Sequence, residues 1–259
     1  METKNTILSR KDASLLENTI IRHGRIVTFA KLRQVFGGEY SLAEIRNRVS
    51  FLSKQGWLVR IKRGLYLVVT DIGSLSSCDI SVFTIAHALN KDSYISFENA
   101  LQHHGMFDQM LATVGSVTFK RARRYKTKDA EIRFFKIKRR FYFGFAEEKS
   151  DIGLVNIARR EKALLDMLYF RSNAYYANLV WEKLNEYKRK IDFDLLEKYA
   201  VRFNLDVARQ TGFFLDRLGL DSSDLEKTVR GRLGYSRMTK DSGKFSAKWR
   251  LYFEPDIVK

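Results

Sequence analysis

The chain has 259 residues, of which 45% are hydrophobic and 13% aromatic, enough for a globular core. Its formal net charge of +17 points to a polyanionic partner, because uncompensated charge of one sign opposes compaction. No stretch approaches the roughly 18 apolar residues of a membrane-spanning helix, and the N-terminal segment METKNTILSRKD lacks the apolar stretch of a secretory signal, so we expect a cytoplasmic protein without membrane contact.

The positive charge is concentrated in two segments. Residues 1–70 carry 13 Lys+Arg against 5 Asp+Glu, and residues 119–140 carry 11 against 2. The rest of the chain is neutral in total. Two separate basic modules describe this distribution better than a surface that is cationic throughout.

The first forty residues predict two helices. Apolar residues at helical spacing in SRKDASLLENTIIRHGR indicate a helix that ends at Gly24. After a short extended segment at Ile26 and Val27, residues 29–36 predict a second helix, which again ends at glycine.

A third helix is predicted from Ser41, the expected N-cap, with Glu44 as its capping-box partner. Its apolar stripe is formed by Leu42, Ile45, Val49 and Leu52. The opposite face carries Ala43, Asn47, Ser50 and Lys54, with Arg46 and Arg48 on the flanks. The helix ends at Gly56, and residues 57–69, WLVRIKRGLYLVV, follow as a hairpin with a cationic turn.

Three short helices and a hairpin are the order of a winged helix-turn-helix domain over residues 1–70, whose third helix enters the major groove while the wing lies along the DNA backbone. Solvated Arg and Lys on an ordinary small subdomain are the alternative. We favour DNA binding because the third helix and the hairpin are both cationic. The candidate DNA-binding residues are Ser41, Ala43, Arg46, Asn47, Arg48, Ser50, Lys54, Arg60, Lys62, Arg63, Gly64 and Tyr66.

A linker is expected over residues 71–79, which read DIGSLSSCD, and residues 80–259 are expected to form a larger mixed α+β domain. Its predicted helices are ISVFTIAHALN, FENALQHHG, REKALLDMLYF and a helical tail over residues 175–218. Its predicted strands are YIS, ATVGSVTFK, EIRFFKIK, YFGF, IGLVNIA and a final extended segment, KFSAKWRLYF.

A second basic patch is predicted in an exposed connection between two of these strands. It consists of Lys120, Arg121, Arg123, Arg124, Lys126 and Lys128. Tyr125 lies among these cations, which suits nucleic acid because cations neutralise phosphates and the ring can stack on a base. A solvated loop and an anionic protein partner remain alternatives.

The sequence gives little support to catalysis or to a cofactor. The single Cys78 and four scattered histidines have no zinc-type spacing, and His103-His104 reads as a helix end. Glu161 and Asp166 are five apart on one helix, which turns them in different directions. Glu131 resembles the acidic strand residue of metal-dependent nucleases without an obvious second ligand. We therefore assign no catalytic residue, no metal and no cofactor, and keep a nuclease-like enzyme targeted by a winged helix as the alternative.

Four segments together resemble the AbiEi-type antitoxins of AbiE (type IV) toxin-antitoxin systems, which act in bacterial phage defence. They are GWLVRIKRGLY, YISFENALQHHG, REKALLDMLY and GYSRMTKDSGKFSAKWRL. The segment MTKDSG departs from the family, in which a Leu-Asp-Pro type segment is common. The resemblance implies a winged-helix repressor that autoregulates its operon at inverted repeats of double-stranded DNA. It also implies that the protein counteracts a nucleotidyltransferase toxin without a stable complex, using positive C-terminal patches for operator binding or antitoxicity.

Overall fold

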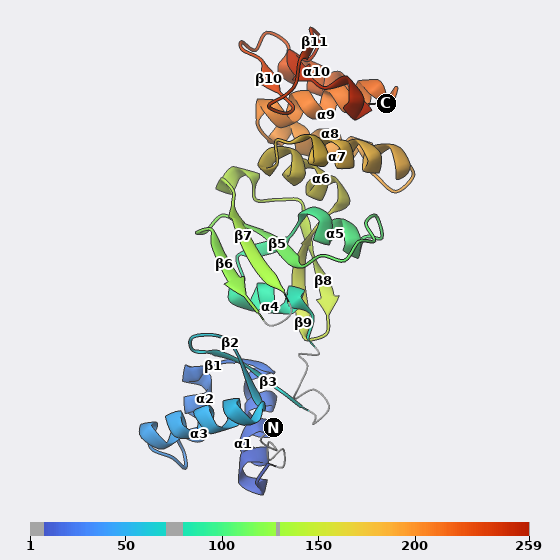
Figure 1. Ribbon diagram of the computed structural model, residues 1–259. Helices are drawn as coiled ribbons and strands as arrows, with labels where there is room; N and C mark the ends of the chain where they lie inside the picture. Colours follow the sequence, from blue (N-terminus) through green and yellow to red (C-terminus); the bar gives the residue numbers. More distant parts are fainter. Residues whose placement is uncertain (1–7, 71–79, 128–129, 259) are drawn as a thin grey trace. The chain divides into compact units, whose positions relative to one another are not determined.

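The protein has an α+β fold, drawn as a ribbon in Figure 1 from a computed structural model. The described residues are 8–70, 80–127 and 130–258. The predicted linker at 71–79 therefore lies outside them. No helix among the described residues is both long enough and apolar enough to cross a membrane.

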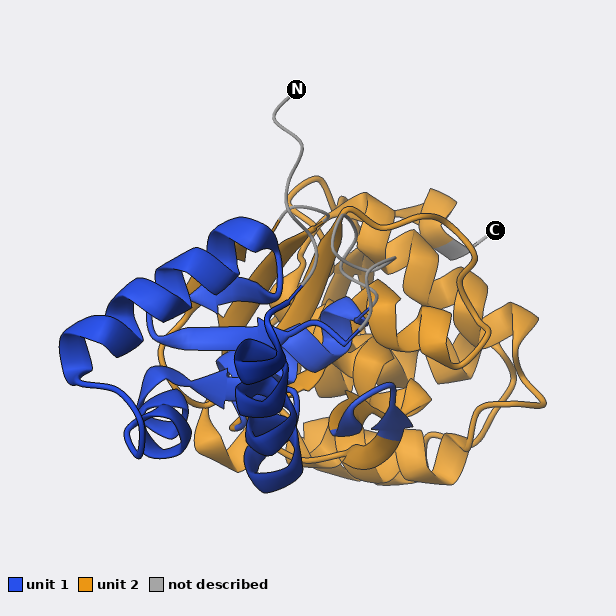
Figure 2. Cartoon of the chain, turned by 90° about the horizontal axis from the view of Figure 1, so that it is seen from below, with its two compact units in different colours: residues 1–91, 149–154 blue, residues 92–148, 155–259 orange. Residues whose placement is uncertain are grey.

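The chain divides into two compact units, which Figure 2 distinguishes by colour. The first contains residues 1–91 and 149–154, and the second contains residues 92–148 and 155–259. The short return of the chain into the first unit is held by Asp151, which accepts hydrogen bonds from the backbone N–H of Ser81 at 2.7 Å and from Thr84 Oγ1 at 2.6 Å.

The first unit opens with three helices and a three-stranded sheet, in the segments where the sequence predicts three helices, a short strand and a hairpin. Its elements are α1 (Arg10–His23), β1 (Ile26–Thr28), α2 (Phe29–Phe36), α3 (Leu42–Gln55), β2 (Leu58–Lys62), β3 (Leu65–Val68) and α4 (Val82–Leu89). The sheet order is β1-β3-β2, and both neighbouring pairs are antiparallel.

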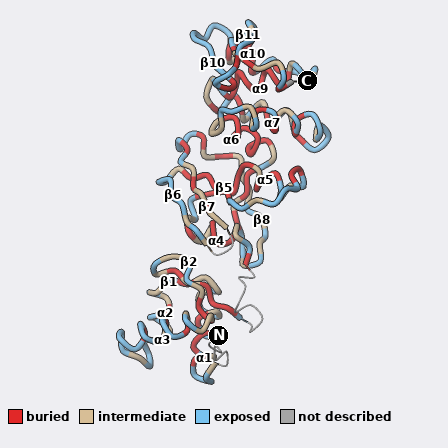
Figure 3. The backbone as a smooth tube through the Cα atoms, viewed as in Figure 1, coloured by how far each residue is buried: buried red, intermediate tan, exposed pale blue. Residues whose placement is uncertain are grey.

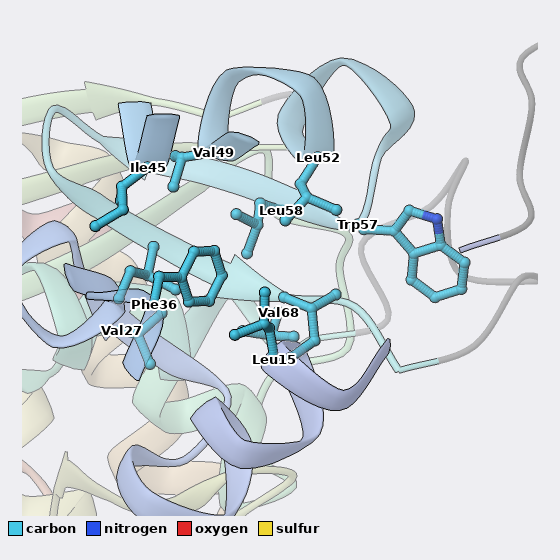
Figure 4. Packing of buried hydrophobic residues seen from close by; sticks show 11 residues of the cluster. Leu15, Val27, Phe36, Ile45, Val49, Leu52, Trp57, Leu58 and Val68 are labelled. Atoms are coloured by element: carbon cyan, nitrogen blue, oxygen red, sulfur yellow. The ribbon is translucent and has the colours of Figure 1, made fainter. Parts of the chain in front are cut away.

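One hydrophobic core joins these helices to the hairpin, as Figure 4 shows. Its buried side chains are Leu15, Leu16, Val27, Leu32, Phe36, Ile45, Val49, Leu52, Trp57, Leu58 and Val68. Full burial of an aliphatic or aromatic side chain of this size contributes about 1.5–3 kcal/mol, so the core fixes how α3 is oriented in the unit.

The second unit contains a six-stranded mixed sheet in the order β6-β7-β5-β4-β9-β8. Its strands are β4 (Ser93–Ile95), β5 (Thr113–Thr118), β6 (Arg123–Lys126), β7 (Glu131–Lys136), β8 (Phe145–Ser150) and β9 (Gly153–Ala158). β5 pairs with β7 and β4 with β9 in parallel, whereas β4–β5 and β6–β7 are antiparallel. β6 is therefore an edge strand.

Helices and a small sheet complete the second unit. The helical elements are α5 (Phe97–His103), η2 (Arg139–Phe141), α6 (Arg160–Phe170), α7 (Ala174–Glu186), α8 (Phe193–Arg202), α9 (Leu205–Arg217), α10 (Ser223–Val229) and η3 (Pro255–Val258). The small sheet has the order β10-β12-β11, formed by β10 (Ser236–Arg237), β11 (Lys244–Ser246) and β12 (Leu251–Phe253).

Three sequence predictions need correction. The basic connection contains strand β6, because an edge strand keeps charged side chains in water while its backbone pairs with one neighbour. The predicted strand YFGF starts only at Phe145, since a short 3-10 turn and Gly144, at φ +77°, come before it. The final extended segment is divided, because residues 247–250 form a turn between β11 and β12, and α10 was not predicted.

Candidate nucleic-acid interface

α3 begins at the capping box that the sequence predicts. Ser41 Oγ accepts a hydrogen bond from the backbone N–H of Glu44 at 3.4 Å, and Glu44 Oε2 accepts one from the backbone N–H of Ser41 at 2.8 Å. Hydrogen bonds from the Ser41 side chain and backbone lower the pKa of Glu44, so the carboxylate stays charged at the positive end of the helix dipole. Ser41 is thereby used in starting the helix.

The two faces of α3 differ as predicted, with one exception. Ile45, Val49 and Leu52 are buried in the core of the first unit. Leu42 is expected on the same stripe but is 39% exposed, because it is the first residue of the helix and projects beyond the core. Side chains that are exposed away from the core belong to Ala43, Arg46, Asn47, Ser50 and Lys54. Figure 3 shows this predominance of exposed residues along α3.

Arg48 is engaged inside the first unit. Its guanidinium forms an ion pair with Asp12 of α1 and lies over the ring of Tyr40, 4.4 Å from the centroid. Asp12 is buried, which makes this pair less accessible to salt than a surface pair. The interaction holds α3 to α1.

An open groove of about 570 Å³ lies beside this ion pair, between α1 and α3. Asn47, Arg48 and Phe51 line it from α3. Phe51 is 51% exposed, an apolar ring on the outer side of the helix that the sequence reasoning did not single out. The sequence does indicate this exposure, since Phe51 lies outside the apolar stripe formed by Ile45, Val49 and Leu52.

The hairpin turns at Arg63 and Gly64. Gly64 has φ +76°, a conformation that glycine adopts at little cost, and its carbonyl accepts a hydrogen bond from the backbone N–H of Phe29 at 2.9 Å. The register of β2 against β3 shifts between Arg60 and Lys62, the mark of a bulge that increases strand twist. The hairpin tip is thus tied to the start of α2.

The four candidate side chains of the hairpin have different surroundings. Arg60 and Arg63 are exposed. Lys62 is partly buried and donates a hydrogen bond to the carbonyl of Leu89, at the end of α4, at 3.1 Å. Tyr66 packs against the core cluster. Exposed cations at the tip are therefore Arg60 and Arg63, whereas Lys62 and Tyr66 make contacts within the first unit.

The second basic patch lies on and before the edge strand β6. Lys120, Arg121, Arg123, Arg124 and Lys126 are all exposed, and Lys128 lies outside the described residues. Two of them approach acids of the same unit: Lys120 Nζ is 3.7 Å from Asp92, and Arg124 Nε is 3.9 Å from Glu131. Both distances are long and both pairs are exposed, so these cations keep their solvent contact.

Tyr125 of β6 is partly buried, and its ring packs edge-on against Phe134 with the centroids 5.9 Å apart. This contact holds the ring against the sheet. An open groove of about 580 Å³ runs along the strand, lined by Arg124, Tyr125, Lys126 and Glu131 among others.

Of the residues that the sequence offers for catalysis, His104 and Glu161 line one pocket, together with Glu148 and Asp192, whereas Glu131 lies on β7. Among the described residues, no group of three or more His, Cys, Asp or Glu side chains could hold a metal ion. His104 caps α5, and its Nε2 lies 2.8 Å from the carbonyl of Ala158. Burial lowers the pKa of His104, which favours the neutral ring. Glu161 accepts a hydrogen bond from the backbone N–H of Asp192 at 3.0 Å, a structural contact.

A fully buried ion pair that the sequence reasoning missed joins two of the motifs. Lys162 and Asp166 are four apart on α6 and form a salt bridge with no solvent exposure. Asp166 also accepts hydrogen bonds from Ser96 Oγ at 2.7 Å and Tyr94 Oη at 3.1 Å. The sequence signal of this pair is the spacing of four between Lys162 and Asp166 in EKALLD.

Burial sets the protonation preferences of this cluster. It lowers the pKa of Lys162 and raises that of Asp166, and the attraction between the two charges opposes both shifts. Burial also raises the pKa of Tyr94 well above its usual value. The rings of Phe203 and Phe143 lie 4.5 Å and 5.3 Å from Lys162 Nζ and close the site to solvent. With no access for a substrate, the cluster is structural.

Comparison with known proteins finds a solved structure of similar fold but no protein family. No family model matches the sequence, and no curated protein matches it. The chain is similar to the crystal structure of the RV2827C protein from Mycobacterium tuberculosis, with a TM-score of 0.61 and 13% sequence identity. The match covers 97% of this chain and 94% of that chain. At this identity the similarity establishes a shared fold across both units and says nothing about activity.

Proposed function

We propose that this protein is a DNA-binding transcriptional repressor and an antitoxin of the AbiEi type. Residues 1–70 act as a winged helix-turn-helix that binds inverted repeats of double-stranded DNA in the protein's own operon. The protein counteracts a nucleotidyltransferase toxin encoded beside it and does not need a stable complex to do so. The resemblance of four sequence segments supports the antitoxin role, and the surface of the first unit supports the DNA-binding role.

One observation carries the DNA-binding role: α3 buries one side in the core and exposes a polar, cationic side. Arg46, Asn47, Ser50 and Lys54 are exposed together on a helix whose apolar stripe is fixed. A helix presented in this way fits the major groove, where carboxamide and guanidinium groups read base edges. Asn47 is the residue we assign to base reading, and Arg46 and Lys54 to flanking phosphates.

The hairpin supplies the second contact in this proposal. Arg60 and Arg63 are exposed on β2 and at its turn, and α3 leads into β2 through Gly56. We assign both arginines to the DNA backbone, as in the wing of a winged helix. Arg48 and Tyr66 act indirectly, because their contacts with Asp12, Tyr40 and the core position α3 and the hairpin.

The exposed cations of β6 provide a further positive surface, in the second unit, for operator phosphates. Sequence-independent phosphate contacts raise affinity without changing specificity. In this proposal the specificity of the protein therefore comes from α3, and β6 contributes only to the strength of binding.

The test is binding of the full-length protein to a labelled duplex from its own promoter region, followed by fluorescence anisotropy. We expect this duplex to bind at least about 10³-fold more tightly than a scrambled duplex of equal length. Asn47→Ala should reduce that preference about five- to 150-fold, since one bidentate base contact is worth about 1–3 kcal/mol. Asn18→Ala, which removes an exposed carboxamide from α1, is the matched control.

Equal binding of the two duplexes by the wild-type protein would refute the repressor. The antitoxin role has its own test, which is growth of cells that express the neighbouring gene with and without this chain. If that gene encodes no nucleotidyltransferase, or if co-expression does not restore growth, the antitoxin role is wrong even where operator binding holds.

A further inference from the structure

The small sheet near the end of the chain carries a third concentration of positive charge. Residues 230–250 contain 7 Lys+Arg against a single acidic residue, Asp241. The charge count of the sequence conceals this segment, because acidic residues elsewhere in the second half balance it. β10, β11 and part of the approach to β12 lie within it.

The strand register places one cation and two rings in a single row across the sheet. Arg237 pairs with Tyr252, and Tyr252 pairs with Phe245. Side chains opposite one another on neighbouring strands share a face. The next row, which contains Ser236 and Leu251, is buried. The row of Arg237, Tyr252 and Phe245 therefore faces away from the core.

Tyr235 extends this row into a group of three rings. Its ring meets that of Tyr252 at 5.2 Å and 79°, and Phe245 meets Tyr252 at 4.9 Å and 47°. The Arg237 guanidinium lies over Tyr252, 4.5 Å from the centroid. Tyr235 is 61% exposed and Phe245 is 49% exposed. The rings of Tyr235 and Phe245 are thus open to solvent, and both contact the partly buried ring of Tyr252 between them.

The sheet is held rigidly from beneath. The buried Arg209 of α9 donates hydrogen bonds to Ser236 Oγ at 3.1 Å and to the carbonyl of Gly234 at 3.1 Å. Trp249 is buried against Gly212, and its Nε1 donates to Asp216 at 2.8 Å. Rings on such a support lose little freedom when a ligand stacks on them, which favours binding.

Several cations of this segment are available to a ligand. Arg230 and Lys248 form ion pairs with acids on α9 and α10. Arg232, Lys240 and Lys244 are exposed, and no acid among the described residues pairs with them. Exposed aromatic rings with the Arg237 guanidinium over one of them, in a segment that also exposes Arg232 and Lys240, are complementary to a ligand with flat apolar faces and regularly spaced negative charges.

We propose that this sheet binds single-stranded nucleic acid, with bases stacked on Tyr235 and Phe245 and phosphates paired with Arg232 and Lys240. A duplex does not satisfy the same surface, because its base faces are covered by stacking and only base edges are accessible in the grooves. Single strands expose those faces, and stacking on an aromatic platform tolerates any sequence. This activity is independent of operator recognition by the first unit.

The test uses the full-length protein with fluorescein-labelled U20, dT20 and the dA20·dT20 duplex, measured by anisotropy in moderate salt. Because the first unit and β6 are proposed to bind duplex, the readout is the change that each variant makes in the affinity for U20, dT20 and the duplex, and we expect only single-strand binding to fall. Tyr235→Ala and Phe245→Ala should each weaken single-strand binding about five- to 150-fold, the equivalent of about 1–3 kcal/mol per stacked base. Tyr235→Phe should retain binding, whereas Tyr235→Leu, which keeps apolar area without a ring, should lose it.

Matched controls separate this site from the rest of the protein. Tyr175→Ala removes a ring that is 55% exposed on α7 and should leave oligonucleotide binding unchanged. Tyr235→Ala should melt like the wild type and keep its operator affinity, and Arg63→Ala should keep its affinity for U20 and dT20. Failure of operator binding alone would leave this proposal intact.

Several results would overturn the proposal. They are duplex binding that Tyr235→Ala and Phe245→Ala weaken as much as single-strand binding, single-strand affinity that neither variant changes, and single-strand binding that survives in Tyr235→Leu. Sedimentation showing that Tyr235→Ala converts an oligomer to a monomer, with no effect on oligonucleotides, would assign the rings to contact between copies of the chain. The ratio of U20 to dT20 affinity identifies which type of strand is preferred.

Discussion

Removal of the positive charge at Arg63 tests the proposal that the hairpin of the first unit lies on a DNA backbone. If every cation predicted on α3 and the hairpin reached a phosphate, about six phosphates would give a log–log salt slope near −5. The structure lowers that expectation, because Arg48 is paired with Asp12 and Lys62 with the carbonyl of Leu89. The exposed cations of this set are Arg46, Lys54, Arg60 and Arg63.

Four phosphate contacts predict a slope of about −3.6, which is a loss of about 150-fold in affinity between 50 and 200 mM salt. Arg63→Ala should bring the slope to about −2.7 and weaken binding to all duplexes alike. The assay is anisotropy on a duplex at several salt concentrations, with Arg22→Ala as the control, since Arg22 is an exposed arginine of α1 outside the proposed contacts. Cations of β6 would steepen the slope of every variant equally.

The difference between the variants therefore decides the outcome. A slope that Arg63→Ala leaves unchanged, or that Arg22→Ala reduces by the same amount, would show that the hairpin tip does not lie on the DNA backbone. Restoration of the wild-type slope by Arg63→Lys would support a contact that depends on charge alone, as expected for a phosphate.

Two further predictions concern the second unit. Lys162→Met should reduce the free energy of unfolding by about 3–5 kcal/mol in chemical denaturation, because it leaves Asp166 in a buried site without its partner. The double variant with Asp166→Leu should regain most of that loss, and Lys227→Met at an exposed pair should change nothing measurable. A Lys162→Met variant as stable as the wild type would contradict burial of the pair. Gly212→Ala should destabilise the protein by about 1–3 kcal/mol despite the better helix propensity of alanine, because its Cβ would lie 2.1 Å from the Trp249 ring. Gly243→Ala is the control, since a Cβ there meets nothing within 4 Å. Equal melting temperatures of the two variants would contradict the packing of Trp249 on Gly212.

Local signals predicted the first unit well. The Ser41 and Glu44 capping box, the glycine after α3 and the alternation of faces on that helix depend on residues close in sequence, and all are present. The exceptions have tertiary causes. Arg48 is drawn from the surface by Asp12, 36 positions away, and no periodicity within α3 encodes that partner.

The second unit shows the same limit more strongly. Most of its strands and helices occupy the predicted segments, but RARRYKTK reads as a loop until the antiparallel pairing of β6 with β7 is known. The aromatic row of the small sheet combines Tyr235, Phe245 and Tyr252, three positions that become neighbours only through the order β10-β12-β11. The charge of this segment can be counted in the sequence, whereas the arrangement of its rings depends on the strand order.

The contact of Trp249 with α9 bears on how deletion experiments are interpreted. The last strands place Trp249, Leu251 and Phe253 under the helices, and all three side chains are buried. A chain truncated before residue 249 would leave α9 with an open notch at Gly212 and an apolar face in water. Loss of function after such a deletion would then report misfolding or proteolysis, whatever the tail binds. Substitutions of exposed side chains, which keep these three residues in place, are the means of mapping recognition on this part of the protein.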